Sequence, residues 1–410
     1  MTGPQTRTIR QRRRSVVIAG VIALLMAGGA VAYSAVVLNP DPCDSKYIAI
    51  YQGLRNYPDC RLDLIDRAIP QVTVTVPGPT TTVAVTPPST SVTSPTKSPP
   101  VTVSVRDFGA TGNSSDESAQ IQAALNSGAQ VVTLGSTGTF RAAVSVPAGV
   151  TFESAGAGMI PVNGSAVLSS GGNGAVIRNI GIDTSAVAGH HTILVSHSGV
   201  HVSGVRVTGD GYRYGVLIEN TQTRLSDVAV EYSTFTHTSY GILKQTTDLD
   251  NARVTGNTFR DTRRGDAIEW NKGHDTGTQI VNNNIDGVHM DGTGYGGLGI
   301  GVAGAGSYNQ PLDNMTSGYT ISGNTVKNAE SEAIHLEKMR DTLIENNYLE
   351  QTANPRSATG IVFYGSSHIT ARGNTVISFD VGIWDAWGVI NGQYVPIDGQ
   401  NVIENNTIRR

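Results

Sequence analysis

The sequence predicts an all-β protein, a right-handed parallel β-helix, over residues 101–410. Two observations predict this fold: a short apolar–polar–Asn motif recurs along the chain, and a second strand-like segment follows each copy. Glycine is also frequent, with 48 of 410 residues, about twice the usual share. This composition favours short strands and tight turns over long helices.

The chain begins with a targeting element. Five arginines lie in the first fourteen residues, and residues 15–38 then carry no charge. A segment of that length crosses a bilayer core of about 30 Å as a helix, and basic residues before it stay in the cytoplasm. We therefore expect residues 1–14 to be a cytoplasmic tail, residues 15–38 to be a single transmembrane anchor in the cell membrane, and the C-terminal domain to be extracellular. The alternative is a signal peptide cleaved after the Ala-Val-Ala site at 30–32, which gives a secreted protein.

Two segments separate this element from the predicted β-helix. Residues 39–70 contain Cys43 and Cys60, which we expect to form a disulfide outside the cytoplasm. A functional thiol pair is the alternative. Residues 71–100 are rich in Thr, Pro, Ser and Val, which predicts an extended linker that holds the next domain away from the membrane.

Charge and composition exclude several classes of function. The net charge is −4, and the part after the arginine cluster is more acidic still, so a nucleic-acid partner is not expected. Two cysteines are too few for a four-thiolate zinc site. The pairs His190/His191 and His197/His201 do not follow a recognised ligand spacing. We therefore expect no metal and no cofactor.

A short helix is predicted near the start of the β-helix. Ser115 or Asp116 can serve as its N-cap, the apolar residues of 121–125 share one side, and Gly128 ends it. We expect this helix to cap the first coil.

The repeated motif defines the coils. Its asparagines are spaced 23 to 41 residues apart, at Asn257, Asn283, Asn324, Asn347, Asn374 and Asn406. Earlier copies place an apolar residue there instead, at Ile180, Val205 and Val228. Periods in the low twenties with insertions indicate a solenoid. Asparagine tolerates a left-handed backbone at a bend, and stacked asparagines can hydrogen-bond along the axis.

The second strand of each repeat can be aligned on one apolar column: Val216, Ile242, Ile268, Ile300, Ile334, Ile361 and Ile383. Alternation then sends the next residue and the third residue outward. Lys244 and Asp385 break the inward pattern, so either the strand ends there or these groups find partners. The outer columns place Glu269 and Asn271 on one side of a coil that offers only Gly301 and Ala303.

Across that glycine coil, His335 and Glu337 face Glu269, about 10 Å away between backbones. Two carboxylates with a gap between them suit acid–base cleavage of a glycosidic bond. His335 beside Glu337 could instead remove a proton from a sugar carbon, as in a lyase or epimerase. We expect Glu269 and Glu337 to share the acid and base roles, with Asp266 and His335 assisting. Six more residues are expected to bind substrate: Arg264, Asn271, Lys272, Lys338, Tyr364 and Trp384.

Two parts of the sequence resemble known families. The stretch VRDFGATGNSSDESAQIQAAL resembles the start of pectate-lyase-like β-helix proteins, including phage tailspikes. From about residue 240 to 401, segments such as GDAIEWN and GLGIGVAG resemble the enterobacterial colanic acid biosynthesis family of pectin-lyase-like fold. This resemblance implies a part in making, trimming or modifying an exported polysaccharide. It carries over as candidates the matching positions Asp266, Glu269, Asn271, His335 and Glu337.

The sequence therefore predicts an exported β-helix protein that acts on extracellular polysaccharide, with glycosidic cleavage as the first hypothesis. A lyase or epimerase and a non-catalytic polysaccharide-binding or surface-assembly protein are the alternatives. The last motif ends two residues before the C-terminus, so a bare final coil could pair with a second copy, giving a homo-oligomer.

Overall fold

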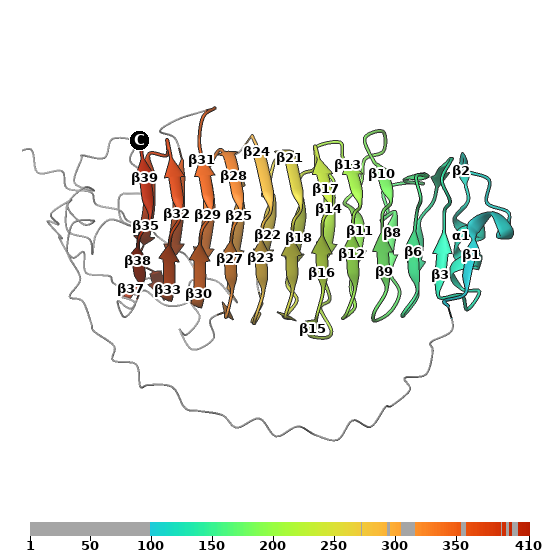
Figure 1. The fold of residues 1–410 in the computed structure, drawn as a ribbon, viewed down its shortest axis with the longest axis horizontal. Coiled ribbons are helices and arrows are strands. Elements are labelled where there is room, and N and C mark those ends of the chain that lie inside the picture. The colour runs from blue at the N-terminus through green and yellow to red at the C-terminus, as the bar shows by residue number, and fades with distance from the viewer. Residues whose placement is uncertain are drawn as a thin grey trace, which may run out of the picture. The chain divides into compact units, whose positions relative to one another are not determined.

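The structure is a computed structural model that describes residues 99–271, 273–292, 296–304, 316–353, 358–386, 388–390, 393–395 and 401–410. In this part the chain winds into a right-handed parallel β-helix, as predicted (Figure 1). Most coils contribute one strand to each of three parallel sheets, which we name A, B and C. Strands of successive coils stack along one axis, with α1 and β1 at one end and β39 at the other.

Sheet A contains β1 (Thr102–Ser104), β3 (Val131–Thr133), β6 (Thr151–Glu153), β9 (Val176–Arg178), β12 (His201–Ser203), β16 (Ala229–Glu231), β20 (Arg253–Thr255), β23 (Gln279–Val281), β27 (Thr320–Ser322), β30 (Met339–Glu345), β33 (Ser367–Arg372) and β38 (Val402–Glu404), with β26 (Thr316–Ser317) beside β30.

Sheet B contains β2 (Asn113–Asp116), β4 (Thr139–Arg141), β7 (Gly158–Ile160), β10 (Gly181–Asp183), β13 (Arg206–Thr208), β17 (Thr234–Thr236), β21 (Thr258–Arg263), β24 (Asn284–His289), β28 (Thr325–Ala329), β31 (Tyr348–Glu350), β34 (Thr375–Ile377) and β39 (Thr407–Arg409).

Sheet C contains β5 (Val144–Val146), β8 (Leu168–Ser170), β11 (His191–Val195), β14 (Tyr214–Ile218), β18 (Ile242–Gln245), β22 (Ile268–Asn271), β25 (Ile300–Ala303), β29 (Glu332–Glu337), β32 (Thr359–Tyr364) and β35 (Val381–Ala386). Two small pairs complete the described strands: β15 (Leu225–Ser226) with β19 (Leu249–Asp250), and β36 (Gly388–Ile390) with β37 (Gln393–Val395).

The first coil uses a helix where later coils use a strand of sheet C. Helix α1 (Ser118–Leu125) follows the 3-10 turn η3 (Val105–Phe108) and buries Ile121, Ala124 and Leu125. The Gln122 side chain accepts a hydrogen bond from the Ser145 amide at 2.8 Å and donates to the Ser145 carbonyl at 2.9 Å. It thereby pairs with the edge strand β5 as a neighbouring strand would. The expected cap differs, because Glu117 holds the N-cap position and makes no capping bond through its side chain.

An asparagine ladder runs through six coils. The side-chain oxygen of each asparagine accepts from the backbone and side-chain nitrogens of its predecessor, at 2.8 to 3.0 Å from Asn257 to Asn406. Asn324 lies at its centre and is 0% exposed. The ladder supplies hydrogen-bond partners to buried amides at the corner of the coil, where no neighbouring strand can supply them.

Two expectations about this corner were wrong. The left-handed backbone falls one residue earlier, for example at Asn282, with φ 57°, and Asn346, with φ 55°. The ladder asparagines contribute through the hydrogen bonds of their side chains instead. In the coil of β17, Ser233 occupies the slot that we assigned to Val228, since its hydroxyl accepts from the Val205 amide at 3.2 Å. Val228 precedes β16 of sheet A instead.

The inward-facing polar residue Lys244 finds a partner inside the solenoid. Its ammonium lies 2.8 Å from Asp275, and the two side chains are 0% and 1% exposed. Asp275 also accepts from the Leu249 amide at 2.8 Å and from the Tyr319 hydroxyl at 3.0 Å. On β35, at the edge of sheet C, the Asp385 carboxylate accepts a hydrogen bond from the Asn401 side-chain amide at 3.1 Å.

No helix among the described residues is long and apolar enough to span a membrane. The predicted anchor at residues 15–38, the linker up to residue 98, and Cys43 and Cys60 all lie outside the described residues. The disulfide, the anchor and the homo-oligomer therefore stay predictions.

Candidate active site

The register of sheet C agrees with the alignment made from the sequence. Ile268 pairs with Ile300, and Ile300 with Ile334, so that the outer columns meet residue by residue. Gly301 lies between Glu269 and His335 on adjacent strands. In the next outer column, Ala303 separates Asn271 from Glu337 in the same way. The solenoid therefore brings together two polar groups that are more than sixty residues apart in the chain.

One position of sheet C departs from the simple alternation of inward and outward side chains. A small residue precedes the aligned apolar position in every coil from β14 to β35: Gly215, Gly241, Ala267, Gly299, Ala333, Gly360 and Gly382. A Cβ on Gly241 would lie 2.3 Å from the ring of Phe259, and one on Gly299 would lie 2.5 Å from Val326. The small column therefore packs inward against sheet B, where larger side chains do not fit.

Because the small column points inward, the residue before it reaches the outer face. This column contains Tyr214, Tyr240, Asp266, Leu298 and Glu332. Of these, only Asp266 was a site residue in the sequence analysis. The signal was present as the recurring triplets YGV, YGI, DAI, LGI and EAI.

These columns enclose a depression of about 240 Å³, which we call the acid pocket. Its lining consists of Glu269, Asn271, Leu298, Gly301, Val302, Ala303, His335 and Glu337. The expectation of a floor without side chains was wrong, because Leu298 lies over Gly301. A Cβ on Gly301 would come within 2.8 Å of the Leu298 side chain. The pocket therefore offers acid groups on two walls and an apolar surface between them.

Asp266 and Glu269 form a carboxyl pair on one wall of the pocket. Their side chains share a hydrogen bond, and Asp266 is only 3% exposed. Burial raises the pKa of Asp266 well above its usual value, and the nearby Glu269 charge adds to this effect. Burial also raises the pKa of Glu269, to about 7. Two adjacent carboxyl groups cannot both ionise readily, so the pair retains a proton near neutral pH.

The surroundings of this pair hold it in place. The Leu298 amide donates to Asp266 Oδ1 at 2.8 Å, and the Tyr240 hydroxyl hydrogen-bonds to Glu269. Burial and the charge of Glu269 raise the pKa of Tyr240, so it remains a neutral phenol. Glu269 is therefore oriented by its neighbours rather than by solvent.

His335 lies between two glutamates on the opposite wall. Its Nε2 is 3.0 Å from Glu337 Oε1, and its Nδ1 is 3.7 Å from Glu332 Oε2, a distance that suits an ion pair better than a hydrogen bond. Burial disfavours the charged imidazole, but Glu332 and Glu337 outweigh burial and raise the pKa of His335 to about 10. Burial disfavours ionisation of Glu332 too, yet its contacts with His335 lower its pKa overall. His335 is thus a cation at neutral pH.

Aromatic rings extend the face on both sides of the acid pocket. Tyr214 and Tyr240 meet edge to face at 5.2 Å between centroids. Beyond the other wall, His335 lies 5.1 Å from Tyr364, and Tyr364 lies 5.7 Å from Trp384. Such rings offer apolar faces on which sugar rings can stack. Tyr214 and Tyr240 were missed from the sequence because they belong to the unrecognised column.

The remaining residues expected to bind substrate are placed differently. Arg264 lines a separate cavity next to the acid pocket. Lys338 follows Glu337 but is only 8% exposed, and burial lowers its pKa. Lys272 lies outside the described residues. Within the described ranges, no group of three or more His, Cys, Asp and Glu side chains is arranged to hold a metal ion.

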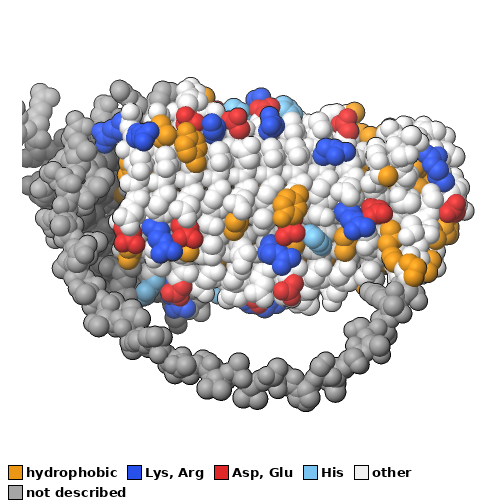
Figure 2. Space-filling view, viewed as in Figure 1, with side chains coloured by type: hydrophobic (Ala, Val, Ile, Leu, Met, Phe, Trp, Pro, Cys, Tyr) orange, Lys and Arg blue, Asp and Glu red, His pale blue; other side chains and the backbone are white. Residues whose placement is uncertain are grey.

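One face of the solenoid carries charges of both signs. On the face drawn in Figure 2, acidic and basic side chains are interspersed along the solenoid and do not form a continuous basic surface. This face therefore produces no long-range field of one sign.

Fold and site together define a right-handed parallel β-helix protein with an acid pocket on the outer face of one sheet. The chain belongs to the colanic acid biosynthesis family WcaM, whose family model matches residues 77–409. A search of curated proteins finds no match.

Several solved structures are similar to this chain. The A-module of the Azotobacter vinelandii mannuronan C-5 epimerase AlgE4 is 15% identical, with a TM-score of 0.43 over 75% of this chain and 95% of the module. The Dettilon tailspike protein is 15% identical, with a TM-score of 0.48 over 75% and 68% of the two chains. The Streptococcus pneumoniae surface adhesin PfbA is 14% identical, with a TM-score of 0.47 over 75% and 97%. These likenesses concern the course of the backbone.

Proposed function

We propose that this chain cleaves glycosidic bonds in an exported polysaccharide, with Glu269 as the general acid and Glu337 as the general base. The observation that carries the proposal is the acid pocket itself. Glu269 and Glu337 belong to its lining and come from strands two coils apart, about 10 Å between backbones. That spacing leaves room for a water molecule beside the sugar, as inverting hydrolysis requires.

The protonation states support these roles. A general acid must carry its proton at the working pH, and a pKa of about 7 lets Glu269 do so up to neutrality. Asp266 shares a hydrogen bond with Glu269, which holds the Glu269 carboxyl group in place. Glu337 is ion-paired with the imidazolium of His335 at 3.0 Å, which orients its carboxylate toward an incoming water molecule.

The proton balance of the step closes within the pocket. Glu269 donates its proton to the glycosidic oxygen as the bond to the anomeric carbon breaks. Glu337 removes a proton from water as the water oxygen bonds to that carbon from the opposite side. The products are two shortened chains, one of which has a new reducing end.

Lyase or epimerase chemistry is less well supported than hydrolysis. The base expected for that chemistry is His335, which would have to be unprotonated near the sugar carbon, and Glu332 and Glu337 hold it as a cation. A purely binding protein would use the aromatic rings beside the pocket but would not need a carboxyl pair that retains a proton.

The family contributes the class of substrate to this proposal. The family is named for colanic acid biosynthesis, and we take an exported polysaccharide as the substrate on that ground. The uncharged segment 15–38 extends the proposal: the β-helix is carried outside the cytoplasm and remains anchored unless the segment is cleaved. Protease treatment of intact cells should degrade the β-helix if it is exposed outside, whereas full protection in intact cells and digestion only after lysis would contradict this placement.

The test of the enzymatic proposal uses the full chain and a panel of bacterial exopolysaccharides. Products are read by mass spectrometry and size-exclusion chromatography. Glu269→Gln and Glu337→Gln should each lower turnover by at least about a hundredfold, because each removes one proton-transfer group. Glu219→Gln is the matched control, since Glu219 lies on the same outer face two coils before Glu269. Turnover that is unchanged in both pocket variants would remove the site assignment. Unsaturated products would indicate a lyase instead.

A further inference from the structure

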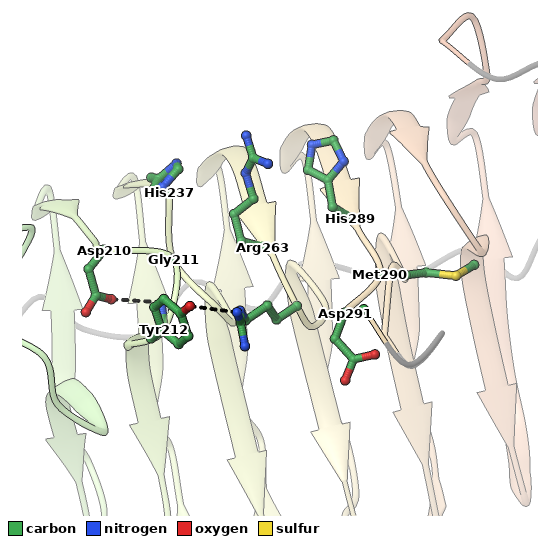
Figure 3. A pocket seen from close by; sticks show the side chains of 10 residues that line it. Asp210, Gly211, Tyr212, His237, Arg263, His289, Met290 and Asp291 are labelled. Carbon is green, nitrogen blue, oxygen red and sulfur yellow. Dashed lines mark hydrogen bonds between the residues drawn. The ribbon is translucent and has the colours of Figure 1, made fainter.

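A second cavity of about 380 Å³ lies beside the acid pocket, where the chain turns from sheet B into sheet C. Figure 3 shows His237, Arg263 and His289 on three successive coils along one side of it, with Tyr212 and Asp291 on the other. We call it the Arg264 cavity, after one of the residues that line it. The proposed cleavage uses none of the residues that line this cavity.

Arg264 is held rigidly in this cavity. Its Nη2 donates to the Tyr212 hydroxyl at 2.7 Å, and the guanidinium carbon lies 3.9 Å from the centre of the Tyr212 ring. The backbone of Arg264 is left-handed, with φ 76°, a conformation that residues other than glycine adopt at a cost in energy. Strain of this kind persists where the surrounding structure holds a residue in place.

The charge of Arg264 is not neutralised by a carboxylate within the described residues. Its neighbour Arg263 pairs with Asp261 at 2.8 Å, whereas the guanidinium of Arg264 contacts the Tyr212 side chain. Nη2 keeps a second N–H beside the one that it donates to Tyr212, and the other guanidinium nitrogens can present parallel N–H donors to the two oxygens of a carboxylate.

The Arg264 cavity and the acid pocket share a wall. Arg264 and Asp266 are separated only by Gly265, over which the ring of Tyr240 lies, since a Cβ at Gly265 would be 2.5 Å from it. Tyr240 in turn hydrogen-bonds to Glu269 in the acid pocket. A single oligosaccharide can therefore occupy both sites, with one sugar at Glu269 and a neighbouring sugar or branch at Arg264.

The lining also selects among anions. Asp210 and Asp291 line the Arg264 cavity together with the arginines. The Asp210 carboxylate already accepts from the Tyr212 and Arg213 amides at 2.8 and 2.9 Å. The two carboxylates repel any anion, but they can accept hydrogen bonds from the hydroxyl groups of a sugar, which offset that repulsion. A sugar acid carries both a carboxylate and several hydroxyl groups.

We propose that the Arg264 cavity binds the carboxylate of an acidic sugar in the polysaccharide, so that the chain acts on acidic rather than neutral polymers. This proposal rests on the proposed function for the identity of the polymer but not for the binding itself. Arg264 is a specificity-determining residue here, and it takes no part in the proton transfers at Glu269 and Glu337.

The test measures binding separately from cleavage. The full chain carrying Glu269→Gln is titrated calorimetrically with oligosaccharides that contain uronic acids, and with the same oligosaccharides after reduction of their carboxyl groups to alcohols. We expect binding of the acidic form to be at least about tenfold tighter, the size expected for one bidentate charged contact. Adding Arg264→Ala should abolish that preference, and Arg264→Lys should restore only part of it.

Arg206→Ala is the matched control, because Arg206 is also an exposed arginine, on sheet B and away from both sites. It should leave the preference unchanged. Thermal unfolding of each variant shows whether the fold is retained, and the lysine variant keeps the test decisive if Arg264→Ala fails to fold. Equal binding of acidic and reduced oligosaccharides would overturn the proposal, as would inorganic phosphate that competes as well as glucuronate. An Arg264-dependent preference without any cleavage by the wild-type chain would reject the proposed function but keep this site.

Discussion

Asp266 and Glu269 lie three residues apart and share a hydrogen bond between their carboxyl groups on the outer face of one coil. The kink at Ala267 makes this contact possible, because the small side chain turns inward and lets both neighbouring acids face outward. Burial is the main reason that the pair retains a proton near neutral pH, and at Asp266 the charge of Glu269 adds to this effect. This stored proton is the chemical feature on which the proposed cleavage depends.

Glu269→Gln should stabilise the protein at alkaline pH. Burial raises the pKa of Glu269 from 4.5 to about 7, so the folded state binds more protons than the unfolded state between those values. The free energy of unfolding therefore falls as the pH rises through this window. The shift corresponds to about 3 kcal/mol if the full difference is expressed. Urea denaturation should show the variant to be more stable than wild type at pH 8 and equal to it at pH 4. A constant difference across this range would contradict the prediction.

His335→Gln should raise the pKa of Glu269. The imidazolium favours the ionised form of Glu269, and glutamine carries no charge. Isotope-edited infrared spectroscopy of the carboxyl stretch can follow the titration of Glu269 without a substrate. We expect its midpoint to move above about 7 in the variant. An unchanged midpoint would show that His335 is too well screened to influence the carboxyl pair.

Gly301→Val should close the acid pocket without unfolding the chain. A Cβ at this position comes within 2.8 Å of Leu298 and 3.5 Å of Asp266, so added methyl groups occupy the space meant for substrate. We expect a loss of oligosaccharide binding of at least tenfold, measured by calorimetry. Gly181→Ala is the control, since nothing lies within 4 Å of its added Cβ. Binding that survives in Gly301→Val would place the ligand elsewhere.

Asn324→Leu should destabilise the solenoid more than the same change at the end of the ladder. It removes the acceptor of the Asn283 amide and the donor to the Ile280 carbonyl, and leaves both groups buried without partners. Unpaired buried groups cost about 1–3 kcal/mol each. Asn406→Leu is the comparison, because Asn406 is only half-buried. Equal losses of stability in the two variants would argue against a cooperative ladder.

Lys244→Met should destabilise the protein by about 3–5 kcal/mol, because it leaves the carboxylate of Asp275 buried without its counter-charge. Lys244→Met combined with Asp275→Leu should recover much of this loss, since an apolar pair requires no neutralisation. The recovery will be incomplete, because Asp275 also accepts from Leu249 and Tyr319. A double variant less stable than Lys244→Met would show that these two contacts outweigh the ion pair.

The errors in the sequence analysis share one physical cause. Val228 was placed in the asparagine slot because its local pattern, apolar–polar–polar–apolar, matches strands of sheet A as well as strands of sheet B. Leu298 and Tyr240 were missed because strict alternation was assumed through the kink at Gly299 and Gly241. A local pattern records which residues are apolar, but not where the backbone departs from a regular strand.

The sequence by itself determined the solenoid, its coil length and the alignment of sheet C, because every coil buries apolar side chains at the same positions and uses the same residue types there. It also placed Glu269 and Glu337 on opposite sides of a glycine coil. Only the tertiary structure decided the protonation of the carboxyl pair, the cationic state of His335 and the assignment of Arg264 to its own cavity. These properties depend on which side chains from other coils crowd a given group and exclude water from it, and no single repeat contains that information.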